Sequence, residues 1–438
     1  MTTHTQLIDR RSYLACPACK GRFVAACDSD RVVAYQRGAL RCVNGHSFAI
    51  KNSVPNLLAP RYTKIIKALT ARDAPPASPR DIGTATGWLS DVLAMDLSSS
   101  RVSRGDRALR RLLSQLARLL ERAGPEGLSD DDVREVCSIL SSEAMSPGYR
   151  RHVADPARAS MEAVNYEKYE DILLRNVMNG CLATGQQVAL IELGSGPGRL
   201  LHQYGSTLSR DENACLLYRR LGPQLYLPAT LPHGDGLRLV LGVDFAQDML
   251  ESAARWFKQD RLGDLVEKGT ISQVRATVRD LPVDFTPAWD DTTRVACILF
   301  QTLGNQIGRT LQLEMLRVAR RLVGKKGVVF VSVFNAESFD EQGPSYYRSI
   351  KGSVGVPWAW GSRAFLSTRG VYSQWFYPDE IRSLFAEAGM EGAQILDERA
   401  LRVFPEYESY IDTRSQERYK RRALVGVYAT GVHIDVGE

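Results

Sequence analysis

Four side chains near the start of the sequence have the types and the spacing of a metal site. Cys16 and Cys19 form a C-x2-C pair, and Cys42 and His46 form a C-x3-H pair. Three thiolates and one imidazole match the tetrahedral ligand set that Zn²⁺ prefers. A redox pair or two unrelated buried thiols would fit the same spacing. We favour structural zinc, because so short a segment buries too little apolar surface to fold without a metal.

A second chemical pattern lies in the middle of the chain, where residues 187–198 read QVALIELGSGPG. Glu192 ends an apolar run, and three alternating glycines follow it, beginning with Gly194 and Gly196. Glycines let the backbone approach a ligand closely, and the helix expected next offers free N–H groups at its N-terminus. The next apolar run ends in Asp244, whose carboxylate could accept both ribose hydroxyls of a bound adenosine. The pattern indicates a nucleotide site.

Strands and helices must alternate around these residues to position them. Six of the expected strands cover 188–191, 237–243, 273–281, 327–335, 391–401 and 423–432, and the remaining one, the fourth in chain order, begins at 294 and runs into Gly304 and Asn305. Helical periodicity falls between several of them, most clearly over 311–323 and 378–390. Strands that alternate with helices predict an α/β fold with a Rossmann-like, doubly wound parallel sheet. Ligands of such sheets bind at the carboxyl ends of the strands.

This series of elements closely resembles the class I S-adenosylmethionine-dependent methyltransferases, over about residues 160–435, with a seven-stranded sheet. The resemblance implies a cofactor site with methionine at the glycine turn, ribose at Asp244, adenine at Asp280 and Leu281, and Phe300 to Thr302 behind the site. The implied cofactor-binding residues are Glu192, Gly194, Ser195, Gly196, Asp244, Phe245, Asp280, Leu281, Phe300 and Gln301. A nicotinamide-binding domain would instead require G-x-G-x-x-G.

The chain departs from that family in one spacing. Asp244 follows Gly198 by 46 residues, where a ribose carboxylate usually follows by about 20. The excess is the segment 211–236, which we interpret as an insertion between the first helix and the second strand. If another residue holds the ribose, the fold is unaffected.

The cysteine-rich start carries a resemblance of its own, over about residues 13–58. The segments CPAC, CVNGHSF and VPNLL are similar to the N-terminal zinc module of bacterial rRNA guanine-N1 methyltransferases. They also resemble small zinc-ribbon proteins that partner other methyltransferases. We therefore expect a zinc-ribbon module at 1–60, a helical connector at 61–160 and a methyltransferase domain at 161–438.

Charge is distributed unevenly along the 438 residues. Residues 1–125 hold 20 Lys/Arg and 9 Asp/Glu, a net charge of +11, whereas the remaining 36 basic and 41 acidic residues give −5. A basic front third can bind nucleic acid, bind an acidic partner or simply stay solvated. The 44% of apolar residues excludes a disordered or collagen-like chain. No apolar run reaches a membrane span and the start lacks a signal-peptide core, so we expect a cytoplasmic protein that binds no membrane.

The acceptor side of the site is expected to be rich in aromatic residues. Residues 336–377 form a long insertion that holds ten Tyr, Trp and Phe side chains between the fifth strand and the next helix. We interpret it as a lid over the cofactor, with a structural hairpin as the alternative. Asn305 after the fourth strand and Tyr346 or Tyr347 in the lid are the candidate catalytic residues, positioning an acceptor or moving its proton.

Transfer of a methyl group to a small molecule, such as a specialised metabolite or an amino-acid-like acceptor, is the leading functional hypothesis. One alternative is intramolecular cyclisation of S-adenosylmethionine with release of methylthioadenosine. A second is methylation of rRNA or tRNA, which the basic front third supports, although the segment FQTLGNQ after strand four lacks a nucleobase-amine motif. A regulatory subunit without catalysis is the non-enzyme alternative. No oligomeric state is predicted.

Overall fold

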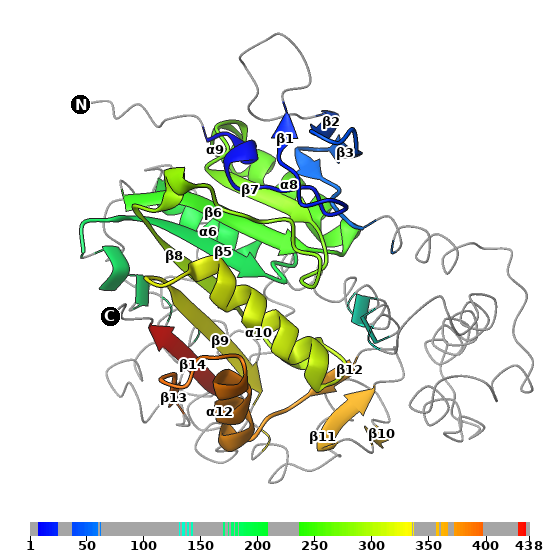
Figure 1. Cartoon of the computed structure of the whole chain (residues 1–438), viewed down its shortest axis with the longest axis vertical. Coiled ribbons are helices and arrows are strands. Elements are labelled where there is room, and N and C mark those ends of the chain that lie inside the picture. The colour runs from blue at the N-terminus through cyan, green and yellow to red at the C-terminus, as the bar shows by residue number, and fades with distance from the viewer. Residues whose placement is uncertain are drawn as a thin grey trace, which may run out of the picture.

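The computed structural model describes most of the sheet-forming parts of the chain (Figure 1). The described stretches are residues 8–24, 37–59, 184–208, 236–334, 356–358, 361–366, 372–396 and 428–434. Single helical or bridging positions are also described, namely 62, 131, 134, 135, 138, 139, 142, 170, 174, 177, 178, 180–182 and 336. The predicted connector at 61–160 therefore falls almost entirely outside the described residues.

A seven-stranded sheet forms the centre of the molecule, in the order β13-β14-β9-β8-β5-β6-β7. Its five parallel strands are β5 (Gln187–Leu193), β6 (Leu237–Asp244), β7 (Ile271–Arg275), β8 (Thr292–Ile298) and β9 (Val328–Phe334). The antiparallel strands are β14 (Tyr428–Ile434) and β13 (Gln394–Leu396). The parallel strands read as near-continuous apolar runs, because both faces of such a sheet are buried. The predicted α/β, Rossmann-like class is confirmed.

Each face of the sheet has its own apolar cluster. Alternate residues of β5 divide between the clusters, with Ile191 on one face and Leu190 on the other, as the period of a strand requires. The first face packs against α10 (Arg309–Val323) and α12 (Pro378–Glu387). The second face packs against α6 (Arg199–Leu208) and α8 (Gln247–Gln259). A shorter helix, α9 (Gly263–Glu267), precedes β7.

A small antiparallel sheet from the start of the chain covers the β7 edge of the central sheet (Figure 1). Its strands are β1 (Phe23–Val24), β2 (Arg37–Cys42), β3 (Ser47–Lys51) and β4 (Val54–Pro55). The backbone N–H of Leu57 donates to the carbonyl of Arg275 at 2.8 Å, and Leu14 bridges Val283. Side chains of this ribbon and of the central sheet belong to one apolar cluster, so the ribbon protects an edge that would otherwise expose unpaired backbone groups.

Tyr13 anchors the N-terminal segment on the central sheet. Its ring is fully buried, and its hydroxyl donates to Ser272 Oγ at 2.9 Å across 259 positions of sequence. The ring meets Trp289 edge-on at 5.8 Å between centroids. Trp289 belongs to a 3-10 turn, η6 (Pro287–Trp289), and its indole N–H donates to Ser12 Oγ at 3.0 Å. These contacts join η1 (Arg10–Ser12) to the loops after β7.

The described parts of the insertion 336–377 form a second small sheet beside α10. Its antiparallel strands are β10 (Val356–Trp358), β11 (Gly361–Leu366) and β12 (Tyr372–Gln374). Trp375 follows them, is 9% exposed, and packs on Phe334 with 5.0 Å between ring centroids. Within the described part of the chain, no helix is long and apolar enough to span a membrane.

Candidate functional site

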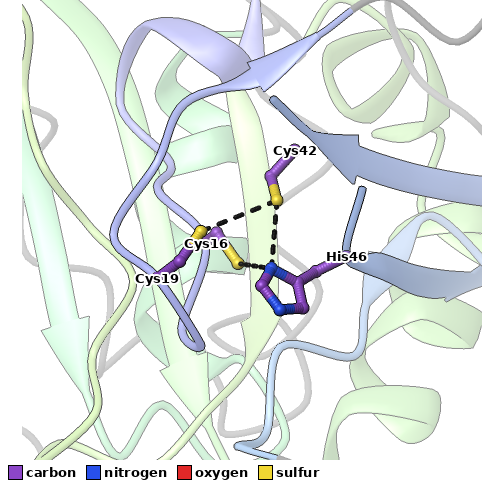
Figure 2. Close-up of side chains that lie close together, drawn as sticks. All are labelled: Cys16, Cys19, Cys42 and His46. Atoms are coloured by element: carbon purple, nitrogen blue, oxygen red, sulfur yellow. Dashed lines mark hydrogen bonds between the residues drawn. The ribbon is translucent and has the colours of Figure 1, made fainter. Parts of the chain in front are cut away.

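Cys16, Cys19, Cys42 and His46 converge on one point in the ribbon (Figure 2). All four ligand atoms lie within 4.8 Å of one another. The Sγ atoms of Cys19 and Cys42 are 3.7 Å apart, and His46 Nδ1 lies 3.3 Å from Cys42 Sγ and 3.7 Å from Cys16 Sγ. The ligand set predicted from the sequence is thus brought together, with the imidazole turned so that Nδ1 faces the sulfurs.

Two tight turns create this convergence. The N–H of Lys20 donates to the carbonyl of Cys16 at 2.8 Å, and Lys20 adopts a positive φ of 59°. In the second turn, the N–H of Gly45 donates to the carbonyl of Cys42 at 2.9 Å, and Gly45 has φ 82°. Left-handed backbone of this kind lets a short loop reverse and aim both of its ligands the same way.

The donor set fits a zinc ion. Zinc–sulfur bonds of about 2.3 Å and zinc–nitrogen bonds of about 2.0–2.1 Å in a tetrahedron place two sulfurs ~3.8 Å apart and a sulfur and a nitrogen ~3.6 Å apart. The measured separations of 3.3–3.7 Å match these values. The N–H of Gly21 and the side chain of Asn44 lower the pKa of Cys19 to about 6, whereas burial raises the pKa of Cys16 to about 11. A bound cation would hold both sulfurs as thiolates.

A cleft lies at the carboxyl ends of β5, β6 and β8. Most of its wall comes from the loops that follow these strands. The lining residues are Ser142, Glu192, Gly194, Ser195, Gly196, Pro197, Arg199, Val243, Asp244, Phe245, Ala246, Met249, Ala276, Val278, Leu299, Phe300, Thr302, Asn305, Gln306 and Met315. Seven of the ten cofactor-binding residues predicted from the sequence, and the candidate catalytic Asn305, are among them.

The glycine turn after β5 lines this cleft with backbone that carries no side chains. Gly194 has φ 80°, and a Cβ there would overlap the side chain of Thr302. Gly198 also has φ 80°, and its Cβ would come within 2.9 Å of both Ala253 and Phe257 on α8. At Gly196, with φ 53°, a Cβ would have no atom within 4 Å, because this residue faces the open cleft. Two of these glycines are needed for packing, and the middle one leaves room for a ligand.

Asp244 lies opposite the glycine turn, at the end of β6. Its Oδ2 accepts the backbone N–H of Gly196 at 2.7 Å, and its Oδ1 accepts that of Ala246 at 2.8 Å. Burial raises the pKa of this carboxyl above its usual range, and these backbone donors oppose the rise. Each carboxylate oxygen can accept more than one hydrogen bond, so Asp244 can brace the turn and still receive a ligand hydroxyl.

Three cofactor residues predicted from the sequence lie outside the cleft lining. The sequence places the end of the third strand at Asp280, but β7 ends at Arg275, and Ala276 and Val278 contribute to the wall instead. Leu281 is 3% exposed and packs in the core with the ribbon. After β7 the chain bonds to the N-terminal segment, where the N–H of Ala15 donates to the carbonyl of Pro282 at 2.7 Å and the N–H of Asp284 donates to the carbonyl of Tyr13 at 2.9 Å.

Gln301 is the third of these residues, and it acts as a brace in the structure. Its Oε1 accepts the N–H of Phe334 at 2.6 Å, and its Nε2 donates to Ser373 Oγ at 3.2 Å. Gln301 and the preceding Phe300 both have positive φ, 68° and 47°. Such a conformation in two consecutive residues with side chains is strained, and strain of this kind persists only where the surroundings hold it.

Residues that the sequence analysis missed lie in the same wall. Arg199 follows the glycine turn directly, and Ser142 comes from the segment assigned to the connector. Near Ser142, Ser138 Oγ accepts the N–H of Ile307 at 2.9 Å, so these described positions of the connector lie against the loop after β8. The position of Arg199 beside the glycines was a usable signal, whereas nothing local to Ser142 pointed to the cleft.

Of the lid positions whose side chains the structure describes, 336 and 372–377, none lines the cleft. Of its aromatic residues, Tyr372 is fully buried, and Trp375 packs on Phe334. Tyr346 and Tyr347 lie outside the described residues, so their candidate roles stay predictions. Asn305 ends the turn η7 (Leu303–Asn305) and is 7% exposed in the cleft wall.

No protein-family model matches the chain, and no curated protein matches it. Among solved structures, the CcbJ methyltransferase from Streptomyces caelestis is 16% identical, with a TM-score of 0.33 over 61% of this chain and 94% of that one. The 1,6-didemethyltoxoflavin-N1-methyltransferase from Burkholderia thailandensis is 13% identical, with a TM-score of 0.34 over 67% and 88%. Magnesium protoporphyrin IX methyltransferase from Synechocystis is 13% identical, with a TM-score of 0.33 over 62% and 90%. At these TM-scores the likeness carries no argument about substrate or residue roles.

Proposed function

We propose that the protein is an S-adenosylmethionine-dependent methyltransferase that acts on a small-molecule acceptor. The observation that carries this proposal is the junction of the glycine turn and Asp244, which face each other across one cleft. A glycine leaves room for the chain that is attached to a nucleoside. A carboxylate at the end of the next strand can accept the ribose hydroxyls. Glu192 at the end of β5 adds a second carboxylate to the same wall.

The residues of the chain would divide the cofactor between the two sides of the cleft. Asp244 would accept the ribose hydroxyls, and Ala276 and Val278 would pack against the adenine on the β7 side. Gly194 and Gly196 would lie along the methionine chain. Bound there, S-adenosylmethionine supplies a methyl group on a sulfonium, which an aligned nucleophile can accept without further activation of the donor.

A small acceptor would lie in the part of the cleft that follows β8. Phe300 and Asn305 line the part of the wall that follows β8, where they would pack against the acceptor and orient it. Holding a nucleophile in line with the methyl group removes much of the entropy barrier, so a positioning amide such as Asn305 is sufficient for this role.

The metal site has a separate, structural part in this proposal. Cys16, Cys19, Cys42 and His46 would close a four-ligand zinc site, which leaves no open coordination position for catalysis. Zinc would hold together the module at 1–60, which packs on the methyltransferase domain at 161–438. The sequence of the ribbon resembles that of the zinc modules of rRNA methyltransferases. RNA is therefore the alternative acceptor that the experiments below test.

Incubation with S-adenosylmethionine, followed by mass spectrometry of all products, tests the proposed reaction. S-adenosylhomocysteine formed only with an added pool of small metabolites would support methyl transfer to one of them. Methylthioadenosine formed without any acceptor would instead establish cyclisation of the cofactor. Methylated ribosomal or transfer RNA, with binding that weakens steeply as salt rises, would replace the small-molecule proposal by the RNA one.

Asp244→Asn tests the cofactor site independently of the acceptor. The amide keeps the size of the side chain but loses the charge and one strong acceptor, so S-adenosylhomocysteine should bind about 5–150-fold more weakly, equivalent to ~1–3 kcal/mol. Calorimetry on the folded variant measures the change. Unchanged affinity would move the ribose contact to another residue.

A further inference from the structure

The small sheet of the ribbon has two faces of opposite character. The inner face packs with the central sheet through alternate residues of β1, β2 and β3, namely Phe23, Leu40, Cys42, Phe48 and Ile50. The residues between them point the other way, because side chains alternate along a strand. These outward positions of β1 and β3 are exposed, and the ribbon lies at one edge of the molecule (Figure 1). The outer face is therefore accessible to another molecule.

Two arginines and two valines form a compact group on this outer face. Val24 pairs with Arg41 across the strands, and in the next pair the N–H of Val43 donates to the carbonyl of Arg22 at 3.1 Å. Residues that pair directly in an antiparallel sheet place their side chains on the same face. Cationic and apolar side chains therefore alternate both along each strand and across the pair. We call this group of four the Arg/Val face.

The two valines are unusually open to solvent. Val24 is 41% and Val43 59% exposed, and they are the exposed large apolar side chains of the described part of the chain. One exposed apolar residue is ordinary on a protein surface, but here both lie on one small face. Val43 also packs over the first metal turn, where a Cβ on Gly21 would lie 3.1 Å from its Cγ2. The turn thus presents this valine in a fixed position.

The arginines of this face have no acidic partner in the described structure. The described ribbon residues, 8–24 and 37–59, include seven Lys and Arg residues but one acidic residue, Asp9. The carboxylate of Asp9 already pairs with an arginine two positions away. Arg22 and Arg41 are exposed, and neither forms an ion pair within the part of the chain that the structure describes. The face therefore carries uncompensated positive charge beside its valines.

This combination fits an acidic protein partner better than a nucleic acid. Arginine is enriched at protein interfaces, and charged patches there meet patches of opposite sign. A nucleic-acid backbone would satisfy the arginines but would offer the valines no apolar partner. Proteins that bind single strands add aromatic side chains on which bases stack, and the outward positions of β1 and β3 hold none.

We propose that the Arg/Val face of the ribbon binds a protein segment that presents acidic side chains next to apolar ones. An extended segment with these side chains at every second residue would match the spacing of the sheet. Its carboxylates would pair with Arg22 and Arg41, and its apolar groups would cover Val24 and Val43. The face is small, so the contact is weak and reversible. None of the four residues lines the cleft, and the proposal does not rest on the proposed function.

Three labelled probes of equal charge test the class of partner. They are a capped peptide with Glu-Ser-Val-Ser repeated three times, the same peptide with serine in place of valine, and a four-nucleotide single-stranded RNA. Fluorescence anisotropy with the full chain at low salt measures their binding. The valine peptide should bind at least about tenfold more tightly than either other probe, because it alone buries apolar surface against the valines. Its affinity should fall as salt rises.

Two double variants remove the two components of the face separately. Arg22→Gln with Arg41→Gln should weaken binding of the valine peptide at least about tenfold and remove most of its salt dependence, because the complementary charges are lost. Val24→Thr with Val43→Thr keeps the shape of the side chains and should lower the affinity for the valine peptide to that for the serine peptide. All four positions are exposed, so both variants should melt as the wild type does.

The matched control is Lys325→Gln with Lys326→Gln, which removes two exposed charges before β9 and should bind the valine peptide as the wild type does. The proposal is wrong if the folded wild-type protein does not bind the valine peptide, or binds both peptides equally. Tighter binding of the RNA would make the face a nucleic-acid surface instead. Self-association in sedimentation that Arg22→Gln with Arg41→Gln abolishes would make the occupant a second copy of this chain and would also overturn the proposal.

Discussion

The proposed metal site and the proposed cofactor cleft are built in opposite ways. Every proposed metal ligand lies between residues 16 and 46, and two hydrogen-bonded turns aim them at one point. The wall of the cleft draws on residues from 142 to 315, which only the sheet brings together. Local spacing therefore determines the first site, whereas the second depends on where each strand ends and on what packs beside it.

The two regions are also in contact. The ribbon bonds to the carbonyl of Arg275 through Leu57, and Arg275 Nε donates to the carbonyl of Phe245 at 2.9 Å. Phe245 lines the cleft beside Asp244. Through these contacts the ribbon can support the cleft. The following variants measure how strongly the ribbon affects stability and ligand binding.

Loss of a metal ligand should have the largest effect. Cys42→Ser removes one of four ligands, and structural zinc sites contribute about 10–16 kcal/mol of apparent binding energy, so we expect a loss on the order of 5 kcal/mol in stability. Metal analysis should fall from one zinc per chain to a small fraction, and thermal unfolding should begin at a much lower temperature. Cys181→Ser, a buried cysteine packed on the other face of the sheet, is the control that should keep its zinc.

Cys42→Ser also tests whether the ribbon supports ligand binding in the cleft. If the ribbon supports the cleft, zinc-free protein that is still folded should bind S-adenosylhomocysteine several-fold more weakly. Equal affinity with and without zinc would mean that the two sites are independent despite their contact.

Glu135 is a buried carboxyl between the segment after the ribbon and the segment after β7, and it predicts a dependence of stability on pH. It accepts the hydroxyl of Tyr62, which follows the ribbon, and lies 3.8 Å from Arg279, which follows β7. Burial raises the pKa of its carboxyl from 4.5 to about 7. The folded state therefore favours the protonated form, and this stabilisation is complete below about pH 4.5 and is lost as the pH rises through about 7.

Glu135→Gln should remove that dependence. The neutral amide carries no charge to bury, so at pH 8 the variant should be more stable than the wild type by at most ~3 kcal/mol. Denaturant unfolding at pH 5 and pH 8 measures the difference. Glu387→Gln on exposed α12 is the control, because Arg309 lowers the pKa of that carboxyl, and a gain at pH 8 in this control would point to a general charge effect.

A methyl group placed in the cleft should weaken both folding and binding, and a matched glycine variant separates the two effects. Gly196→Ala puts a Cβ where no protein atom lies within 4 Å, at a φ of 53° that costs about 1–2 kcal/mol for a residue with a side chain. The affinity for S-adenosylhomocysteine should fall at least about tenfold, or ~1.4 kcal/mol. Gly185→Ala has a similar φ of 75° and open surroundings outside the cleft, so it should match the cost in stability and leave binding unchanged.

The smallest effect is expected at the surface between the ribbon and α8. Lys51 Nζ lies 2.7 Å from Glu251 Oε1, and the lysine side chain is 69% exposed. Lys51→Ala should cost about 0.5 kcal/mol at low salt and less at high salt, because exposed ion pairs are screened. Thermal unfolding at two salt concentrations measures it, with Lys258→Ala on α8 as the comparison. A loss above about 2 kcal/mol would mean that the ribbon depends on this pair for its position.

Elements with local signals could be predicted from the residues alone. The C-x2-C and C-x3-H pairs predict their own convergence, because each pair spans a single turn. The glycines at 194, 196 and 198 predict a tight turn before a helix, and the apolar run of β5 predicts a strand buried on both faces. The carboxylate of Asp244 could also be placed, since it directly ends an apolar run and the end of a parallel strand faces the ligand edge.

The residues that complete the cleft depend instead on contacts across the fold. β7 ends at Arg275 rather than Asp280, and the chain that follows it bonds through Pro282 and Asp284 to the N-terminal segment. Gln301 forms hydrogen bonds to residues of β9 and β12 and so links the two strands. No local sequence pattern predicts these contacts. The buried ion pair between Glu170 and Arg199 is a further example. A buried polar group must find its partners wherever the fold supplies them, and that choice depends on contacts between residues far apart in the sequence.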